Sequence, residues 1–207
     1  NLLRDKAPGP SLLIIEAPTG EGKTEAALYA AQQLAQHNKA TGAVLAAPTM
    51  ATANGLFKRF SRWVENITEN SAVSSLYLAH GKNKLNSDYR KLRYSDIGED
   101  CADHGTVIAT DWLSGRKSGL LSNFVVGTID QVLMMALQIR HSMLRHLALA
   151  GKVVIFDEVH AYSTYTNEYL AETLRWLAAY GVPVILLSAT LPLSRKNELI
   201  SAYGGQL

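Results

Sequence analysis

Short runs of apolar residues alternate with longer amphipathic stretches along most of this chain. The apolar runs predict buried strands at Ser11–Ala17, Gly42–Pro48, Val73–Ala79, Asn123–Gly127, Lys152–Asp157 and Val182–Ser188. The amphipathic stretches predict helices at Lys23–His37, Thr52–Ile67, Ile129–Leu149 and Thr166–Ala179, with another beginning near Ser194. Strands that are apolar along their whole length and alternate with helices indicate an α/β fold, in which a mostly parallel sheet is covered on both faces.

One stretch, from about residue 80 to about residue 122, breaks this alternation, being more polar and less periodic. We interpret it as an insertion or a long surface connection, and a solvated charged loop is the simpler alternative. The chain has 207 residues, which is enough for a single domain, residues 1–207, with a substantial core.

Charge and cysteine content exclude some classes of protein. A net charge of +2 gives no overall basic field, so any nucleic acid would be bound at a local site. The single cysteine, Cys101, cannot form an internal disulfide, which fits a reducing cytoplasm. No apolar run approaches the roughly 18 residues that indicate a membrane span, so we expect none.

The first predicted strand runs into the sequence A-P-T-G-E-G-K-T, residues Ala17 to Thr24. This matches the phosphate-binding pattern G-x-x-x-x-G-K-[ST] except that alanine replaces the first glycine. Gly20 and Gly22 allow the turn that directs backbone N–H groups at phosphates, Lys23 can reach the β- and γ-phosphates, and Thr24 can ligate Mg²⁺. The candidate nucleotide-binding residues are Ala17, Pro18, Thr19, Gly20, Glu21, Gly22, Lys23 and Thr24.

Two adjacent carboxylates, Asp157 and Glu158, follow the apolar run V-V-I-F. A phosphate-binding loop needs a second element for Mg²⁺, usually an aspartate at the end of a neighbouring strand, and Asp157 occupies that position. The cation would offset the cost of burying that charge. Glu158 would then orient and polarise the water that attacks the γ-phosphate. The alternative is that both carboxylates only cap the following helix.

The last predicted strand is followed directly by Ser188, Ala189 and Thr190. By itself this S-A-T sequence favours a polar turn. Here it directly follows the next predicted strand after D-E-V-H, and this position makes it a candidate part of the same site.

Taken together, these motifs identify a resemblance. A-P-T-G-E-G-K-T, A-P-T-M-A-T-A-N, D-E-V-H and L-S-A-T-L-P, in this order, resemble the first RecA-like lobe of a superfamily 2 helicase. L-A-H-G, V-V-G-T-I-D-Q-V-L and D-E-V-H-A-Y narrow the resemblance to the CRISPR-associated helicase–nuclease of type I systems. It implies a RecA-like P-loop fold, ATP-driven movement along single-stranded DNA, recruitment by a guide-RNA surveillance complex, and target degradation by a histidine-aspartate nuclease domain.

The resemblance also implies roles by position. Lys23, Asp157 and Glu158 would be catalytic, with Thr24 and Asp157 holding Mg²⁺. His160 and Ser188–Thr190 would couple the nucleotide state to movement of the lobe. The implied DNA contacts are Pro48, Thr49, Thr52, Gly127 and Thr128, through amides and hydroxyls that would read phosphate and sugar. Thr49 and Thr52 alternatively cap the helix that follows them, and His160 is alternatively an ordinary residue at a helix end.

The chain departs from the family pattern in three respects. Ser163 stands where the family commonly has an acidic residue, no His-Asp dipeptide occurs, and the second RecA-like lobe with its arginine finger is missing. We therefore expect this chain alone to bind nucleotide weakly and to turn it over poorly or not at all. Two other functions stay open: a different superfamily 2 motor, such as a restriction translocase or an RNA helicase, and a catalytically silent docking lobe.

Overall fold

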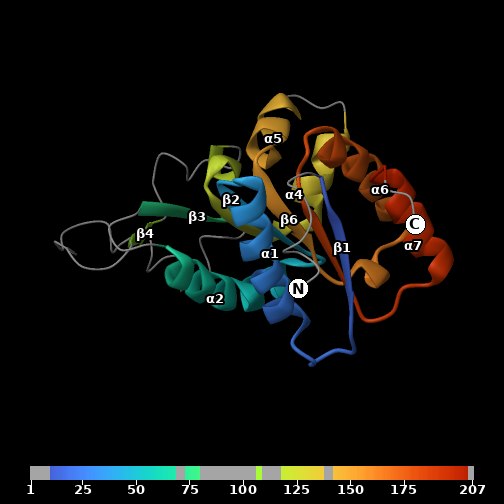
Figure 1. Ribbon diagram of the computed structural model, residues 1–207, viewed down its shortest axis with the longest axis horizontal. Helices are drawn as coiled ribbons and strands as arrows, with labels where there is room; N and C mark the ends of the chain where they lie inside the picture. The colour runs from blue at the N-terminus through green and yellow to red at the C-terminus, as the bar shows by residue number, and fades with distance from the viewer. Residues whose placement is uncertain (1–9, 69–72, 80–105, 109–117, 138–141, 205–207) are drawn as a thin grey trace.

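In a computed structural model of the chain, a parallel β-sheet is enclosed by helices (Figure 1). The structure describes residues 10–68, 73–79, 106–108, 118–137 and 142–204. The strands within these ranges are β1 (Leu12–Glu16), β2 (Gly42–Ala47), β3 (Val73–Ala79), β4 (Thr106–Ile108), β5 (Phe124–Thr128), β6 (Lys152–Phe156) and β7 (Val184–Ser188). The described strands lie in the order β1-β7-β6-β2-β5-β3-β4, and each neighbouring pair is parallel. The predicted parallel sheet is confirmed.

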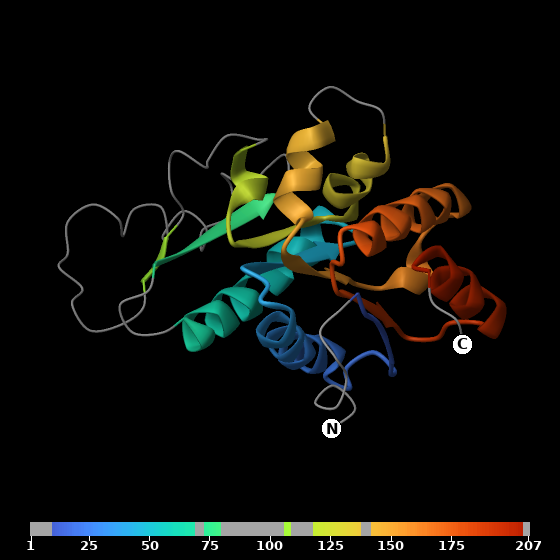
Figure 2. The same ribbon diagram turned by 45° about the horizontal axis from the view of Figure 1, so that its top comes forward.

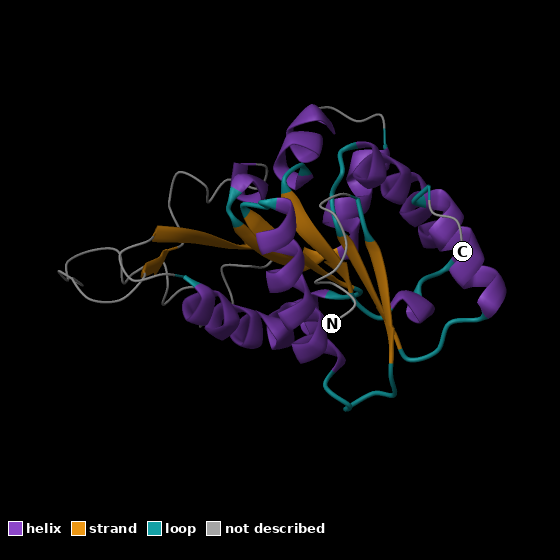
Figure 3. Cartoon of the chain, in the orientation of Figure 1, coloured by secondary structure: helices purple, strands orange, loops and turns teal. Residues whose placement is uncertain are grey.

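Helices cover both faces of this sheet. The α-helices are α1 (Lys23–Asn38), α2 (Met50–Ile67), α4 (Ile129–Leu133), α5 (Ser142–Leu149), α6 (Thr164–Ala179) and α7 (Leu193–Ala202). Short 3₁₀ turns occur at η3 (Ser118–Leu121), η4 (Met134–Ala136) and η5 (Val159–Ala161). Figure 2 shows α1 and α2 on one face and α4, α5 and α6 on the other, and the alternation of strand and helix is visible in Figure 3.

The helix predicted over Ile129–Leu149 is wrong as a single element. Helix α4 ends at Leu133, η4 follows, and Leu137 is already extended, with φ −95° and ψ 140°. The apolar residues M-M-A-L at 134–137 are consecutive, so they lack the 3.6-residue spacing that would give a helix one buried face. Instead Met135 is buried, and a second helix, α5, begins at Ser142.

Most of the predicted insertion, residues 80–105 and 109–117, lies outside the described residues. Two parts of it are regular. Strand β4 adds to the sheet by pairing Thr106 with Val73, and η3 lies against β3, where a Cβ on Gly119 would come within 2.3 Å of the Tyr77 ring. The stretch therefore includes an edge strand, which its polar composition did not predict.

The central strands are held by apolar side chains on both faces. Every residue of β2, β5, β6 and β7 is buried, and α2 places Phe57 and Phe60, each fully buried, against the sheet. Burying one such side chain contributes about 1.5–3 kcal/mol. This packing makes the sheet a rigid frame for the loops that follow the strands.

The strand order brings the predicted motifs to one edge. In a parallel sheet all carboxyl ends lie on the same side, where ligands bind in α/β folds. Along that edge the strand ends lie in the order β1, β7, β6, β2 and β5. In the same order, the motifs at these ends are the phosphate loop, Ser188–Thr190, Asp157–Glu158, Pro48–Thr49 and Gly127–Thr128. The predicted nucleotide side and the predicted DNA side thus meet at β6.

Candidate functional site

The phosphate loop is shaped by two glycines in the left-handed region. Gly20 has φ 93° and Gly22 has φ 78°, a conformation that strains any residue carrying a Cβ. Gly22 is the N-cap of α1 and has no side chain to cap it, whereas α2 and α6 are capped by threonine and serine hydroxyls. The first N–H groups of a helix have no intrahelical partner, so α1 presents them, with the positive end of its dipole, to an anion.

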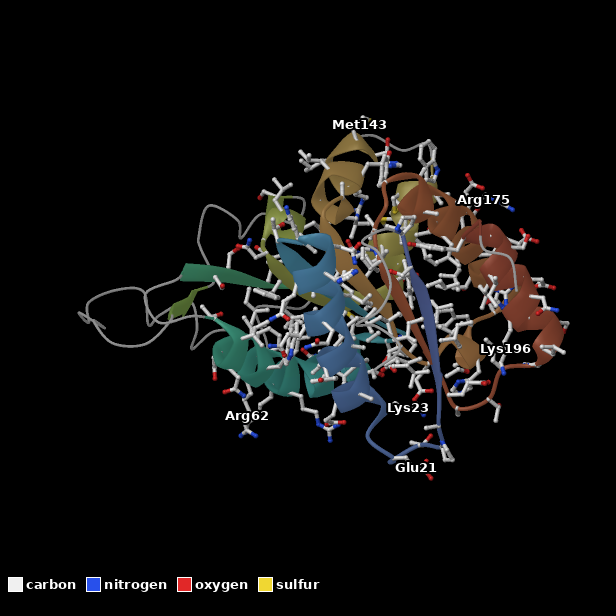
Figure 4. The ribbon with its side chains drawn as sticks, in the orientation of Figure 1. Glu21, Lys23, Arg62, Met143, Arg175 and Lys196 are labelled. Carbon is white, nitrogen blue, oxygen red and sulfur yellow. The ribbon has the colours of Figure 1, made fainter. Side chains whose placement is uncertain are left out.

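Lys23 places a buried cation behind this loop. Only 7% of the residue is exposed, and its Nζ donates a hydrogen bond to the carbonyl of Ala17 at 2.7 Å. The same Nζ lies 3.9 Å from Oε1 of Glu158. An ammonium has three donors, so a contact to one carbonyl and a long contact to one carboxylate leave capacity for a phosphate. Figure 4 shows Lys23 and Glu21 at the same end of the molecule.

Asp157 follows β6 and is 6% exposed. Burial, and next the neighbouring charge of Glu158, raise the pKa of its carboxyl to about 6. Its backbone is fixed, because its N–H donates to Ala46 and its carbonyl accepts from the Tyr162 hydroxyl at 2.6 Å. The backbone is thus held in place, and the carboxylate is buried at an electrostatic cost that a bound cation would relieve.

Glu158 has a strained backbone, with φ 53°. Left-handed geometry in a residue other than glycine is uncommon and clusters at functional sites. Its Oε2 is buried and has no hydrogen-bond partner among the described residues. The side chain caps neither η5 nor α6, whose N-cap is Ser163, so the capping alternative for this carboxylate is not seen. Ser163, the departure from the family pattern, accepts a hydrogen bond from Thr166 N at 3.2 Å.

His160 joins the end of β6 to the end of β7. The backbone N–H of Ala189 donates to His160 Nδ1 at 3.2 Å, so this nitrogen acts as an acceptor and the ring proton is assigned to Nε2. Ser188 Oγ lies 3.3 Å from the same nitrogen and donates to the Thr190 carbonyl at 2.9 Å. Glu158 Oε2 lies 3.3 Å from Nδ1. This contact is not a hydrogen bond, because Nδ1 carries no proton to donate when the ring proton is on Nε2.

The phosphate loop, Lys23, Asp157 and Glu158 converge on one cavity of about 590 Å³, which His160 and Ser188–Thr190 do not line. Its lining includes eight predicted residues, namely Thr19, Gly20, Gly22, Lys23, Thr24, Thr52, Asp157 and Glu158. The remaining lining residues, which sequence reasoning missed, are Glu25, Leu56 and Arg59. The hydroxyl of Thr24 and the carboxylate of Asp157 are hard oxygen donors of the kind Mg²⁺ prefers, and such sites are completed by water and phosphate oxygens.

The missed residues come mainly from α2. Nη1 of Arg59 lies 3.4 Å from Oε1 of Glu25 on α1. Thr52, which was predicted as a DNA contact, is on the cavity wall. No local pattern marks Arg59, because its approach to α1 depends on how α2 crosses the sheet. Helix α2 therefore borders this cavity and carries one predicted DNA contact, Thr52, while a second, Thr49, is its N-cap.

The predicted DNA residues lie together at the ends of β2 and β5, which pair Ala47 with Thr128. Thr49 Oγ1 accepts from Thr52 N at 3.1 Å, so the helix-capping alternative for Thr49 is observed. Gly127 has a packing reason, since a Cβ there would come within 2.8 Å of Ala79. Thr128 is 7% exposed, which leaves little of its side chain available, whereas Thr49 is exposed.

Comparison with known proteins decides the family. A model of DEAD/DEAH box helicases matches residues 7–199. The chain belongs to the DEAD/DEAH box helicase family. The helicase chain is 48% identical over 201 residues to the CRISPR-associated nuclease/helicase Cas3 of Streptococcus thermophilus, covering 96% of this chain and 22% of that protein.

Solved structures agree with this assignment. T. fusca Cas3-ADP superimposes on this helicase chain with a TM-score of 0.83 at 43% identity, covering 97% of this chain and 22% of that one. A chain in a CRISPR RNA-guided surveillance complex, pre-nicking, matches with a TM-score of 0.67 at 36% identity, covering 97% of this chain and 19% of that one. The resemblance to a RecA-like helicase lobe of the Cas3 type is confirmed, and the chain spans about a fifth of the length of these relatives.

Among the helices that the structure describes, none is both long enough and apolar enough to cross a membrane.

Proposed function

We propose that this chain is the ATP-binding motor lobe of a longer single-stranded DNA translocase or helicase that acts in type I CRISPR interference. The observation that carries the proposal is the convergence of Lys23, Asp157 and Glu158 on one cavity beside the phosphate loop. The family match and the likeness to Cas3 proteins support it. In the whole protein this lobe would power the unwinding and degradation of invading DNA.

ATP would bind with its phosphates over the loop Ala17–Thr24. Gly20 and Gly22 give the loop its concave shape, the uncapped start of α1 supplies N–H donors, and Lys23 would contact the β- and γ-phosphates. The likeness to T. fusca Cas3-ADP, a structure of a relative with an adenine nucleotide, supports this assignment.

Thr24 and Asp157 would hold Mg²⁺, since both line the cavity and both offer oxygen ligands. When bound, the cation neutralises the charge that develops on the phosphate oxygens. Asp157 must be ionised for this role, and the pKa of about 6 means that its proton is already lost at neutral pH.

Glu158 would orient the attacking water. Its carboxylate lines the cavity and can take a proton from water as the water oxygen forms its bond to the γ-phosphorus and the bond to the ADP oxygen breaks. The 3.9 Å contact to Lys23 would keep the carboxylate beside the γ-phosphate. His160 would report the change to Ser188–Thr190 through the Ala189 amide.

DNA would lie along the ends of β2 and β5. Pro48, Thr49, Thr52, Gly127 and Thr128 are the proposed contacts, with Thr49 the most accessible of the polar side chains and Thr128 contributing mainly backbone. A second RecA-like lobe would complete the ATP site with an arginine. The parent protein would also carry a histidine-aspartate nuclease domain and be recruited by a guide-RNA surveillance complex, as the likeness to a chain of such a complex suggests. The single cysteine, Cys101, supports a cytoplasmic location.

The test is ATP hydrolysis by the longest natural chain containing this segment, with and without single-stranded DNA. We expect strong stimulation by DNA that Glu158→Gln abolishes. Stimulation by RNA in place of DNA would instead favour an RNA helicase. Nucleotide binding that is indifferent to Lys23→Ala, with no turnover, would favour a docking lobe and overturn the proposal.

A further inference from the structure

Glu16, the last residue of β1, stands directly before the phosphate loop, and both of its carboxylate oxygens are engaged. Oε1 accepts the backbone N–H of Leu191 at 2.7 Å, and Oε2 lies 2.5 Å from Nζ of Lys196. Leu191 immediately follows Ser188–Thr190, and Lys196 is on α7. Figure 4 shows Lys196 in the half of the molecule that holds Lys23. Glu16 therefore ties the start of the phosphate loop to the segment that follows β7.

That segment, Ser188–Leu191, is held at its other end as well. The Ser188 carbonyl accepts the N–H of Ala17 at 3.3 Å, and the Ala189 N–H donates to His160. One end of the turn is thus fixed to His160, two residues after Glu158, and the other is fixed to the carboxylate of Glu16. The contacts of Glu16 join segments that are far apart in the sequence, since Leu191 is 175 positions away in the chain.

The path from Glu16 to the reacting groups is short. Its neighbour Ala17 accepts the hydrogen bond of Lys23 Nζ at 2.7 Å, so a displacement of the end of β1 moves the carbonyl that positions the ammonium. The hydrogen bond from Lys196, and further the Leu191 N–H, lower the pKa of Glu16. The carboxylate is therefore ionised at neutral pH, and its two bonds are charge-assisted.

Stability alone is a weak reason for this arrangement. The side chains of Lys196 and Glu16 are 30% and 32% exposed, and ion pairs as open to solvent as this one contribute little to folding. By contrast, the Leu191 N–H and the Lys196 ammonium both bind the Glu16 carboxylate. Together they fix the position of the turn after β7 relative to the phosphate loop.

We propose that Glu16 is a positioning residue that keeps the turn Ser188–Leu191 in register with the phosphate loop, so that the movement of one is transmitted to the other. The inference rests on the proposed function, because it assigns Glu16 to the coupling of ATP turnover to DNA movement. Without this tie, the loop would still bind ATP, but its movement would be transmitted less completely to Ser188–Thr190.

The experiment uses the full natural chain and three variants. In Glu16→Gln the amide oxygen can still accept from Leu191, but the amide nitrogen faces the ammonium of Lys196 as a second donor. Lys196→Met removes only the ion pair. Glu172→Gln is the matched control, since Glu172 pairs with Arg175 on the surface of α6 at 2.6 Å. Three quantities are measured: KM for ATP, DNA-stimulated kcat, and base pairs unwound per ATP hydrolysed.

For Glu16→Gln we expect base pairs unwound per ATP to fall roughly tenfold while KM for ATP changes less than about twofold, as for loss of a charge-assisted bond that positions a remote group. Lys196→Met should show a smaller fall in the same ratio, and Glu172→Gln none. Hydrogen exchange followed by mass spectrometry should show faster exchange of the Leu191 amide in Glu16→Gln, because a neutral amide oxygen holds this N–H less strongly than a carboxylate does. A purely structural role would lower all activities together and leave the ratio unchanged.

An unchanged ratio in Glu16→Gln, with wild-type turnover stimulated by DNA, overturns the role of Glu16 alone. A wild-type protein that shows no DNA-stimulated turnover instead overturns the proposed function, and the coupling role falls with it.

Discussion

The charged residues at the two ends of strand β6 are buried in opposite ways. At the carboxyl end, Glu158 Oε2 is buried without a partner, and Asp157 is buried beside it with a raised pKa of about 6. At the amino end, Lys152 is equally buried, at 4% exposure, but its Nζ donates to the carbonyls of Leu120 and Ser122 at 2.7 and 2.6 Å. The carboxylates after β6 are thus left without full partners, whereas the ammonium at the start of β6 is hydrogen-bonded within the protein.

Asn123, near the amino end of β5, is also hydrogen-bonded within the protein. The Asn123 side chain accepts from the Ser75 hydroxyl at 2.9 Å and donates to the Thr41 carbonyl at 3.1 Å, so that it links the segments before β2 and β5 with β3. Burial of a polar group is therefore no sign of function by itself in this fold. The informative signs are an acceptor left open and a backbone held at φ 53°, and both occur at Glu158.

The largest effect should come from closing the open acceptor. Glu158→Gln replaces a base with an amide of the same size, so the full natural chain should lose roughly 10²–10⁴-fold in DNA-stimulated kcat with KM for ATP little changed. Single-turnover and steady-state ATP hydrolysis would measure this. A variant that retains wild-type turnover would mean that another group orients the water.

At the amino end the corresponding change should affect folding and leave chemistry alone. Lys152→Ala leaves two buried carbonyls without their donor and opens a cavity, so we expect the free energy of unfolding to fall by about 2–4 kcal/mol. Urea denaturation of the 207-residue chain would measure it. Nucleotide affinity of the variant, measured where it is still folded, should match that of the wild type; a selective loss of affinity would contradict the separation of the two ends.

Asp157→Asn should raise the free energy of unfolding while it removes a proposed ligand of Mg²⁺. The pKa of the Asp157 carboxyl is raised from 3.8 to about 6 in the fold, so the folded state holds a proton that the unfolded chain has already released. The resulting loss of stability grows between pH 4 and pH 6 and persists above. Without Mg²⁺ at pH 7.5, the variant should therefore be more stable by roughly 1–3 kcal/mol, and the gain should vanish below pH 4. Chemical denaturation in chelator at both pH values checks this, and a gain that is independent of pH would contradict the assigned cause.

Much of this organisation was predictable from sequence because it is local. The apolar runs ending in A-P-T-G-E-G-K-T and D-E-V-H fix the strands and the residues at their ends, and a parallel sheet then brings those ends together. Two features that were missed depend on tertiary contacts: the pairing of β4 with β3 and the approach of Arg59 to Glu25. The break after Leu133 had a local sign, the consecutive apolar residues at 134–137, which the prediction of one long helix overlooked. The tie between Glu16 and Leu191 spans 175 positions, and no periodicity indicates it.

The smallest predicted effect concerns Thr49, where one hydroxyl has two candidate roles. It caps α2 by accepting from Thr52 N at 3.1 Å, and it is also a proposed DNA contact. Thr49→Ala should cost about 1 kcal/mol of stability and also weaken single-stranded DNA binding by the full natural chain, whereas Thr49→Ser should restore both. Ser163→Ala is the matched control, because Ser163 caps a different helix, α6, through the same bond, from Thr166 N at 3.2 Å, and is not a proposed DNA contact. Equal stability losses in the two alanine variants, with DNA affinity reduced only in Thr49→Ala, would separate the contact from the cap. Equal DNA affinities would leave Thr49 with the structural role alone.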